Sequence, residues 1–218
     1  GTQLLVGQSG ECLRPTREDP ALVEPVAVVE GVLADPRVDH CHVAHLVRMR
    51  GMKDRGRGST PAMVALETAG VPFVVREFHH EPGERHYGLA AAAALGVDPE
   101  RVFKTLVANL TTERGTEPVV GIVPVSGQLS LRGLAAALGA KRAEMCPTDA
   151  AERITGYVVG GISPFGQKKR LRTVIDETCI LFETVLVSGG RRGVDLEVAP
   201  DDLVRVLGAD VAPIADAT

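Results

Sequence analysis

The amino-acid sequence predicts an α+β fold, in which helices pack around a mixed β-sheet. From residue 59 onward, stretches rich in β-branched residues alternate with stretches that carry helix start and stop signals. Late in the chain, several predicted strands follow one another with no helix between them, which does not fit a doubly wound parallel sheet. A domain of about 160 residues buries roughly 70% of its unfolded surface, so this part is long enough to fold alone.

The predicted helices are bounded by capping and stop residues. Thr60 is a good N-cap, Pro61 fits the first helical position, and Gly70 fits the end of the helix. The same signals predict four further helices. Two are Leu89–Leu95, which ends before Gly96, and Asp201–Leu207, which ends before Gly208. The other two are capped by Ser130 and Thr148; the first runs to Leu138 and ends at Gly139, and the second ends at Gly156.

Short apolar stretches rich in valine and isoleucine are predicted to be strands. They are Phe73–Phe78, Val102–Ala108, Val119–Val125, Tyr157–Val159, Thr173–Ile175, Leu181–Val187 and Val194–Val198. The last three follow one another directly, and this order favours a mixed sheet over a parallel one.

Residues 1–58 differ from the rest because they show no sustained helix or strand period and are interrupted by four prolines. The basic, glycine-bearing stretch 48–58 is typical of a linker. We therefore expect two parts: an N-terminal extension over 1–58 that is disordered or not native, and a folded domain over 59–218. We also hypothesise that the native start lies near Met52.

The amino-acid composition excludes several classes of protein. An apolar fraction of 44% and a charged fraction of 24% exclude collagen-like, fibrous and wholly disordered chains. There is no run of ~18 apolar residues, no recognisable signal peptide and no disulfide pattern, so we expect a cytoplasmic protein without membrane association. Because the net charge is −4 and aromatic residues make up 3%, binding to nucleic acid would need a local basic patch.

Lys104 is the first candidate for chemistry. It shares one face of a predicted strand with Val102 and Leu106, and no carboxylate is adjacent to it in the sequence. The commoner arrangement is an edge lysine whose amine reaches water. The alternative is a partly desolvated ammonium, its pKa lowered by burial, that binds an anion or an ester oxygen.

Two Gly-Gly loops lie beside clusters of cations. Adjacent glycines let the backbone approach a ligand and present N–H donors to it, although tight turns and solvated charge runs use the same residues. Together the loops predict a pocket for a polar or phosphorylated ligand, and their cations predict contacts to a phosphate backbone. The first loop runs from Gly160-Gly161 through Ile162-Ser163-Pro164 to Lys168-Lys169-Arg170, and the second is Ser188-Gly189-Gly190-Arg191-Arg192 with Asp195 close behind.

The sequence gives little support for other catalytic arrangements. The chain has no Gly-x-Ser-x-Gly motif, and Cys146 and Cys179 are interpreted as small buried apolar residues. The histidines from His79 to His86 lack a metal-ligand spacing, and the cluster His40–His45 falls in the N-terminal extension. We expect neither a metal site nor a cofactor, and metal analysis of the protein would test the cluster.

Residues 60 to about 211 resemble the YbaK family of Cys-tRNA(Pro) deacylases, freestanding relatives of the editing domain inserted in bacterial prolyl-tRNA synthetases. The matching motifs are Thr60-Pro61-Ala62, Val97-Asp98-Pro99, Phe103-Lys104-Thr105-Leu106, Thr155-Gly156-Tyr157, the block from Gly160 to Arg170, the block from Val187 to Gly193, Asp202-Leu203 and Leu207-Gly208-Ala209. The resemblance implies that family's fold, α+β with a mixed, partly barrel-like sheet and surrounding helices. It covers none of residues 1–58.

The resemblance implies a trans-editing enzyme that clears cysteine from Cys-tRNA(Pro), with Cys-tRNA(Cys) as a further substrate. Its implied partners are the aminoacylated acceptor end of tRNA and prolyl-tRNA synthetase. The thiol of the substrate attacks its own ester carbonyl and leaves as a cyclic thiolactone, so no protein nucleophile is needed. Two alternatives stay open: an Ala-tRNA(Pro) deacylase that positions a water molecule, and a non-catalytic module that binds the tRNA acceptor end.

The resemblance also implies site residues. Lys104 would hold the acceptor end, and the Gly160-Gly161 backbone would cradle the aminoacyl carbonyl. The implied substrate pocket comprises Phe78, Ile162, Ser163, Pro164, Ser188, Gly189 and Asp195, and the implied tRNA contacts are Lys168, Lys169, Arg170, Arg191 and Arg192. Phe78 stands where relatives commonly carry a tyrosine, which leaves the choice between cysteine and alanine open.

Overall fold

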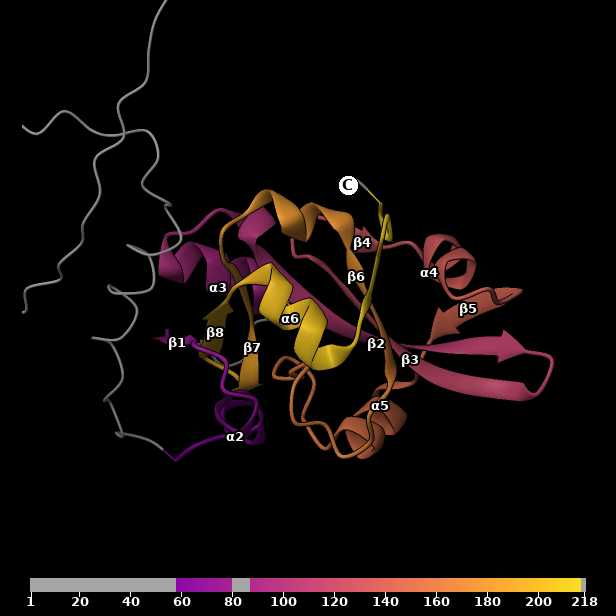
Figure 1. The fold of residues 1–218 in the computed structure, drawn as a ribbon, viewed down its shortest axis with the longest axis horizontal. Helices are drawn as coiled ribbons and strands as arrows, with labels where there is room; N and C mark the ends of the chain where they lie inside the picture. Colours follow the sequence, from indigo (N-terminus) through magenta and orange to yellow (C-terminus); the bar gives the residue numbers. More distant parts are fainter. Residues whose placement is uncertain (1–57, 80–86, 217–218) are drawn as a thin grey trace, which may run out of the picture.

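The structure, a computed structural model, describes residues 58–79 and 87–216. Within these ranges an eight-stranded mixed sheet runs in the order β1-β8-β7-β2-β3-β6-β9, and β5 also pairs with β2 (Figure 1). A separate pair joins β4 to β10. The predicted mixed sheet with surrounding helices is confirmed. The described strands do not close into a barrel, since β1 and β9 are the two ends of the sheet.

The elements have the following bounds. The strands are β1 (Val74–Glu77), β2 (Val102–Thr112), β3 (Gly115–Pro124), β4 (Gln128–Leu129), β5 (Arg142–Met145), β6 (Arg172–Asp176), β7 (Val185–Arg191), β8 (Val194–Val198), β9 (Asp210–Ala212) and β10 (Ala215–Asp216). The helices are α2 (Pro61–Thr68), α3 (Tyr87–Leu95), α4 (Leu131–Ala137), α5 (Thr148–Thr155) and α6 (Pro200–Leu207), with short 3-10 helices η1 (Pro99–Arg101) and η2 (Glu177–Leu181).

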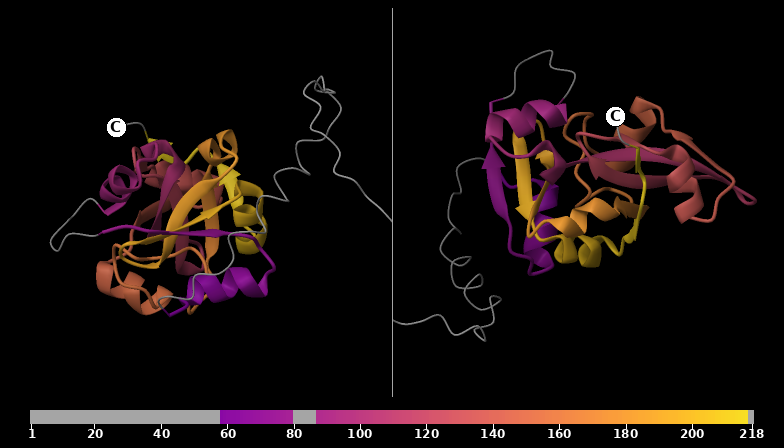
Figure 2. Two further views of the ribbon diagram at one scale, coloured as in Figure 1. Left: turned by 90° about the vertical axis from the view of Figure 1, so that its left-hand side faces the viewer. Right: turned by 90° about the horizontal axis from the view of Figure 1, so that it is seen from above.

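The two faces of the sheet are covered by different helices. Alternation along β2 sends Phe103 and Val107 into one core cluster, which α2, α5 and α6 cover with Ala62, Ala151 and Leu203 among its members. The neighbouring side chains of β2 lie on the opposite face, where Ala92 of α3 and Leu134 of α4 pack. Seen from above, α3 lies on one side of the strands and α2 and α6 on the other (Figure 2, right).

All predicted helices are present, and the differences concern the start of one helix and two of the predicted strands. Thr148 is the first residue of α5 rather than its cap, a position that Pro147 occupies without a side-chain hydrogen bond. The predicted strand Tyr157–Val159 is wrong, because the chain turns there and the Tyr157 hydroxyl donates to the Phe165 carbonyl at 2.8 Å. The strand predicted from Leu181 begins at Val185, because η2 extends to Leu181 and residues 182–184 are not part of a strand.

Candidate active site

The long central strand β2 loses its neighbour on one edge for a few residues. On that edge β7 pairs with Val102 and Phe103, and β5 pairs with residues 108–111. Residues 104–107 between them have no partner strand in the described sheet, while β3 pairs along the whole opposite edge. A cavity of about 380 Å³ lies at this gap, with every residue from 102 to 107 in its wall.

Several elements complete the wall of the cavity. They come from the end of β1, the start of α3, the turn after β3, the β5–α5 connection, the first Gly-Gly loop and the β7–β8 hairpin. The residues that they contribute are Phe78, Tyr87, Gly88, Leu89, Ala91, Val125, Met145, Cys146, Thr148, Ala151, Val159, Gly160, Ile162, Ser188, Arg191, Arg192, Gly193 and Asp195. The gap therefore brings both predicted glycine loops to Lys104.

Lys104 is half-buried in the wall of this cavity. Its Nζ donates to the backbone carbonyl of Gly127, and no carboxylate pairs with it among the described residues. Burial lowers the pKa of the Lys104 amine because desolvation disfavours the charged form. Of the two arrangements that the sequence left open, the structure has the partly desolvated ammonium facing a cavity.

Asp195 and Ser188 lie opposite each other on β8 and β7, on the same face of the sheet as Lys104. Asp195 is 7% exposed, and no described residue donates a hydrogen bond to it. Burial raises the pKa of Asp195 to about 6. The Ser188 hydroxyl accepts a hydrogen bond from the Gly190 N–H at 3.4 Å, and its own proton remains available to a ligand. The cavity thus holds an unpaired carboxyl group, which a cationic ligand would satisfy.

The first Gly-Gly loop approaches the cavity through Gly160. Gly160 has φ +85°, a conformation that favours glycine, and a side chain there would meet the ring of Tyr87 at 2.8 Å. Its N–H has no acceptor among the described residues, whereas the Gly161 N–H donates to the Val158 carbonyl at 2.9 Å. A Cβ on Gly161 would lie 3.0 Å from the Arg191 backbone, so Gly161 lets the loop pack closely against the β7–β8 hairpin.

Arg192 ties this loop to α3. Its guanidinium lies 4.9 Å from the centre of the Tyr87 ring and donates twice to the Val159 carbonyl, at 3.0 Å and 2.7 Å. Arg191 also lines the cavity, and it forms an ion pair with Glu77 at 3.0 Å. The mouth of the cavity is therefore cationic on its hairpin side.

Not all the predicted pocket residues reach the cavity. Phe78, Ile162, Ser188 and Asp195 line it, whereas Ser163, Pro164 and Gly189 do not. Ser163 is fully buried and its hydroxyl accepts from the Phe165 N–H, while the Gly189 carbonyl accepts from the Thr60 hydroxyl at 2.6 Å. These residues hold the two loops in place.

Only some of the predicted tRNA contacts reach the cavity. Arg191 and Arg192 line the cavity, whereas Lys168, Lys169 and Arg170 do not. The Lys168 N–H donates to the Thr155 carbonyl at the end of α5, and Arg170 donates to the Leu207 carbonyl at the end of α6. The Lys168–Arg170 segment is thus anchored to the helices that cover the face opposite α3.

Tyr87, Thr105 and Cys146 are among the residues of the cavity wall that were not predicted as site residues. Thr105 belongs to the motif around Lys104, which could have marked it, whereas no local signal marks Cys146, which reaches the site through the gap between β7 and β5. Burial raises the pKa of the Cys146 thiol despite a hydrogen bond from Asn109, so the thiol stays protonated and is a poor nucleophile. Cys179 is fully buried, as predicted, and burial is the main cause that raises the pKa of its thiol to about 11.

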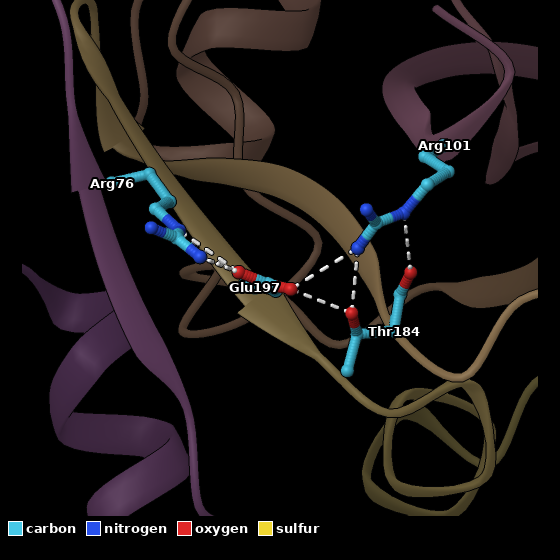
Figure 3. A network of polar contacts seen from close by, with 4 residues as sticks. All are labelled: Arg76, Arg101, Thr184 and Glu197. Carbon is cyan, nitrogen blue, oxygen red and sulfur yellow. Dashed lines mark hydrogen bonds and ion pairs between the residues drawn. The ribbon is translucent and has the colours of Figure 1, made fainter. Parts of the chain in front are cut away.

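A polar network behind the cavity holds the strands that carry it (Figure 3). Glu197 accepts from Arg76 at 2.6 Å and 2.8 Å, from Arg101 at 3.1 Å and from Thr184 at 2.6 Å. Burial opposes ionisation of Glu197, but the hydrogen bonds and the two arginines outweigh it and lower its pKa. The network joins β1 and β8 to η1, which directly precedes β2, and Glu197 lies on the same face of the sheet as Asp195.

No metal or membrane element is found in the part of the chain that the structure describes. Among residues 58–79 and 87–216, no group of three or more His, Cys, Asp or Glu side chains could hold a metal ion. None of the described helices is long and apolar enough to cross a membrane. The His40–His45 cluster, the 80–86 histidines and the N-terminal extension lie outside the described residues.

Comparison with known proteins agrees with this geometry. The family model of the aminoacyl-tRNA editing domain matches residues 84–206, more than half of the chain. The chain belongs to this family. The match spans α3, β2, both Gly-Gly loops and β8, and so includes nearly the whole wall of the cavity.

Similar proteins carry names that point the same way. An Enterococcus faecalis protein named "Putative Cys-tRNA(Pro)/Cys-tRNA(Cys) deacylase EbsC" is 35% identical over 163 residues, which is 74% of this chain and 96% of the relative. A crystal structure of "a putative trans-editing enzyme for prolyl tRNA synthetase" superposes with a TM-score of 0.63 and 25% identity, over 74% of this chain and all of the other. A crystallised hypothetical protein shares the fold with a TM-score of 0.64, at 23% identity, over 72% of this chain and all of its own.

Proposed function

We propose that this protein is a trans-acting deacylase that removes cysteine from Cys-tRNA(Pro), with Cys-tRNA(Cys) as a further substrate. The observation that carries the proposal is that Lys104, Gly160 and Asp195 line one small cavity. Each offers a different group: a cation, an N–H donor without an acceptor, and a buried carboxyl group. An aminoacyl ester at the end of a tRNA needs all three, since it has phosphates, a carbonyl oxygen and an α-ammonium.

In the proposed binding mode the α-ammonium of the amino acid lies against Asp195. This contact would stabilise the ionised carboxylate, whose pKa burial raises to about 6 in the protein alone. The Gly160 N–H would face the ester carbonyl, where negative charge develops during the reaction. Lys104 would hold the oxygens of the terminal nucleotide.

The chemistry then needs no nucleophile from the protein. The substrate thiol loses its proton as its sulfur forms a bond to the ester carbonyl carbon. The ester C–O bond breaks, the proton ends on the ribose oxygen, and the amino acid leaves as a cyclic thiolactone. The walls of the cavity hold the thiol near the carbonyl, and proximity of this kind can supply several kcal/mol of the barrier. The protonated, half-buried thiol of Cys146 fits this division of roles.

The basic residues at and beyond the mouth would bind the acceptor stem. We propose Arg191 and Arg192 as contacts to the terminal phosphates and Lys168, Lys169 and Arg170 as contacts further along the backbone. This basic surface is small on a chain of net charge −4, so the protein would discriminate weakly among tRNAs by itself. We therefore propose prolyl-tRNA synthetase as the partner that supplies tRNA(Pro), and the cytoplasm as the place of action.

The experiment is release of amino acid from purified Cys-tRNA(Pro) and Ala-tRNA(Pro), with wild type, Lys104→Ala and Lys141→Ala compared. Lys141 is the matched control because its side chain is 79% exposed and lies outside the cavity. We expect rapid loss of cysteine from wild type and Lys141→Ala, and a fall of about 10²–10³-fold in Lys104→Ala.

The other outcomes separate the alternatives. A preference for alanine would identify an Ala-tRNA(Pro) deacylase with water as the nucleophile, since alanine has no thiol. Binding of tRNA without turnover of either substrate would identify a non-catalytic acceptor-binding module.

A further inference from the structure

The peptide bond that joins Val159 to Gly160 lies in a tight turn, and both residues line the catalytic cavity. The turn is closed by the Gly161 N–H, which donates to the Val158 carbonyl at 2.9 Å, and Gly160 at its third position has φ +85°. This φ is that of a type II turn, in which the central peptide faces the opposite way from the commoner type I turn. Because other residues rarely adopt this φ, glycine at position 160 determines which way the peptide faces.

The carbonyl of this peptide is held by an ionised side chain. The exposed Arg192 guanidinium donates to the Val159 oxygen through Nε at 3.0 Å and through Nη2 at 2.7 Å. Within residues 58–79 and 87–216, no other arginine directs two N–H groups at one backbone carbonyl. Hydrogen bonds from an ionised donor are roughly twice as strong as neutral ones, so the oxygen is held firmly.

The same contact acts on the Gly160 N–H, because this N–H and the Val159 carbonyl belong to one peptide unit. A trans peptide is planar, and its C=O and N–H point in opposite directions, so holding the oxygen also fixes the direction of the N–H. Hydrogen bonds in a chain polarise one another, by about 10–30% per bond, so a cation at the oxygen strengthens the N–H as a donor. This N–H has no acceptor among the described residues, which leaves it for a ligand.

Neighbouring groups keep Arg192 at this carbonyl. Its guanidinium lies 4.9 Å from the centre of the Tyr87 ring. The ring also packs against the turn, since a Cβ on Gly160 would lie 2.8 Å from it. The hairpin backbone lies against the same loop, because a Cβ on Gly161 would lie 3.1 Å from the Arg192 backbone nitrogen. The arginine, the ring and the turn therefore pack as one unit.

We propose that Arg192 is a positioning residue that orients and polarises the Gly160 N–H for the oxyanion formed during deacylation. This inference rests on the proposed function, which assigns that N–H to the ester carbonyl. A donor aimed at developing charge stabilises the transition state more than the bound substrate, so loss of the Arg192 contact should affect the rate more than binding. The three other N–H groups of the guanidinium can still contact a phosphate, so both roles of Arg192 are compatible.

The test measures release of cysteine from Cys-tRNA(Pro) in single turnovers with the full chain in excess, which gives a maximal rate and a half-saturating protein concentration. Arg192→Lys keeps the charge but loses the planar fork that directs two N–H groups at one oxygen, and Arg192→Ala loses both. Arg205→Lys is the matched control, because Arg205 is also exposed, pairs with Asp202 at 2.7 Å and lies outside the cavity.

A second readout follows the peptide itself. The amide nitrogen resonance of Gly160, measured by NMR in isotope-labelled protein, depends on the hydrogen bonds that the Val159 carbonyl accepts. It should move in Arg192→Lys and in Arg192→Ala and stay in place in Arg205→Lys. A role of Arg192 in phosphate binding alone would not move it in the free protein.

We expect Arg192→Lys to lower the maximal rate about 10-fold, part of the ~10²–10³-fold loss that follows removal of an oxyanion donor. The half-saturating concentration should stay within about 2-fold, because the charge is kept. Arg192→Ala should lower the maximal rate further and also raise the half-saturating concentration. Arg205→Lys should change neither quantity.

The results that overturn the inference differ from those that overturn the proposed function. An unchanged maximal rate in Arg192→Lys, or an unmoved Gly160 resonance in Arg192→Ala, would show that Arg192 does not position this N–H. If the wild type releases alanine instead of cysteine, the same variants are compared on Ala-tRNA(Pro), since charge develops on the same oxygen. If it releases neither, the proposed function fails and this inference fails with it.

Discussion

Asp195 is expected to make the folded protein less stable as pH rises. Its pKa is raised by burial from an ordinary 3.8 to about 6, so the folded state binds this proton more tightly than the unfolded chain does. The free energy of unfolding therefore falls as pH rises from about 4 to about 6 and stays low above that range. Since each pKa unit corresponds to about 1.36 kcal/mol, the decrease is about 3 kcal/mol.

Asp195→Asn removes this titration. The stability of the variant relative to wild type should increase by about 2.5 kcal/mol between pH 4 and pH 7.5, because part of the decrease in wild type has already occurred at pH 4. Taking the change of this difference with pH cancels any constant cost of burying the amide. The same variant should lose deacylase activity, because the proposed contact to the α-ammonium needs a carboxylate.

The assay is urea denaturation of both proteins at several pH values between 4 and 7.5. Asp149→Asn is the control, since the Asp149 side chain is 79% exposed and its substitution should stay within about 0.5 kcal/mol at every pH. A constant difference between Asp195→Asn and wild type over this range would refute the reasoning that burial of an unpaired carboxyl group raises its pKa.

Three other substitutions probe the polar network, the glycine loop and the cationic mouth. Glu197→Gln should lower the free energy of unfolding by about 1–3 kcal/mol at pH 7, a change opposite in sign to that of Asp195→Asn. The greater stability of wild type should diminish as pH falls through the lowered pKa of Glu197. Denaturation at pH 7 and pH 3.5 would show this. Gly161→Ala should cost about 1–3 kcal/mol in the same assay, because its Cβ would lie 3.0 Å from the Arg191 backbone, whereas Gly58→Ala meets nothing within 4 Å and should be neutral. Arg192→Ala should weaken tRNA binding and reduce the slope of log affinity against log salt by about 1 for each phosphate that Arg192 neutralises, and an unchanged slope would exclude such a role.

The helices were predictable because their signals act within one turn of the chain. Thr60 caps α2 by accepting from the Met63 N–H, and Gly208 ends α6 at φ +58°. Strands are less local. Arg142–Met145 is a strand only because it pairs with β2, and its residues are mostly exposed, contain no β-branched side chain and therefore give no strand signal. Tyr157–Val159 has the composition of a strand but pairs with no strand of the described sheet. Tyr157 is buried because its side chain packs in the core and its hydroxyl donates to the Phe165 carbonyl.

The candidate site was predictable as motifs and not as a cavity. Lys104, Gly160 and Asp195 were singled out from the sequence, and they do line one cavity. Ser163 and Gly189 belong to the same motifs, yet their polar groups are used inside the loops. A motif shows which segments lie near a site, but side-chain direction and hydrogen bonding decide which of its residues reach the ligand.

The sequence by itself determined the α+β class, the helices and the segments that carry the chemistry, because capping, periodicity and motif composition are properties of neighbouring residues. Only the tertiary structure decided where the cavity lies. It forms where β7 stops pairing with β2 and β5 has not begun, and this depends on contacts between segments far apart in the chain. The tertiary structure also decided that the Asp195 carboxyl is buried without a donor among the described residues, since burial and the lack of a partner are properties of the folded surroundings.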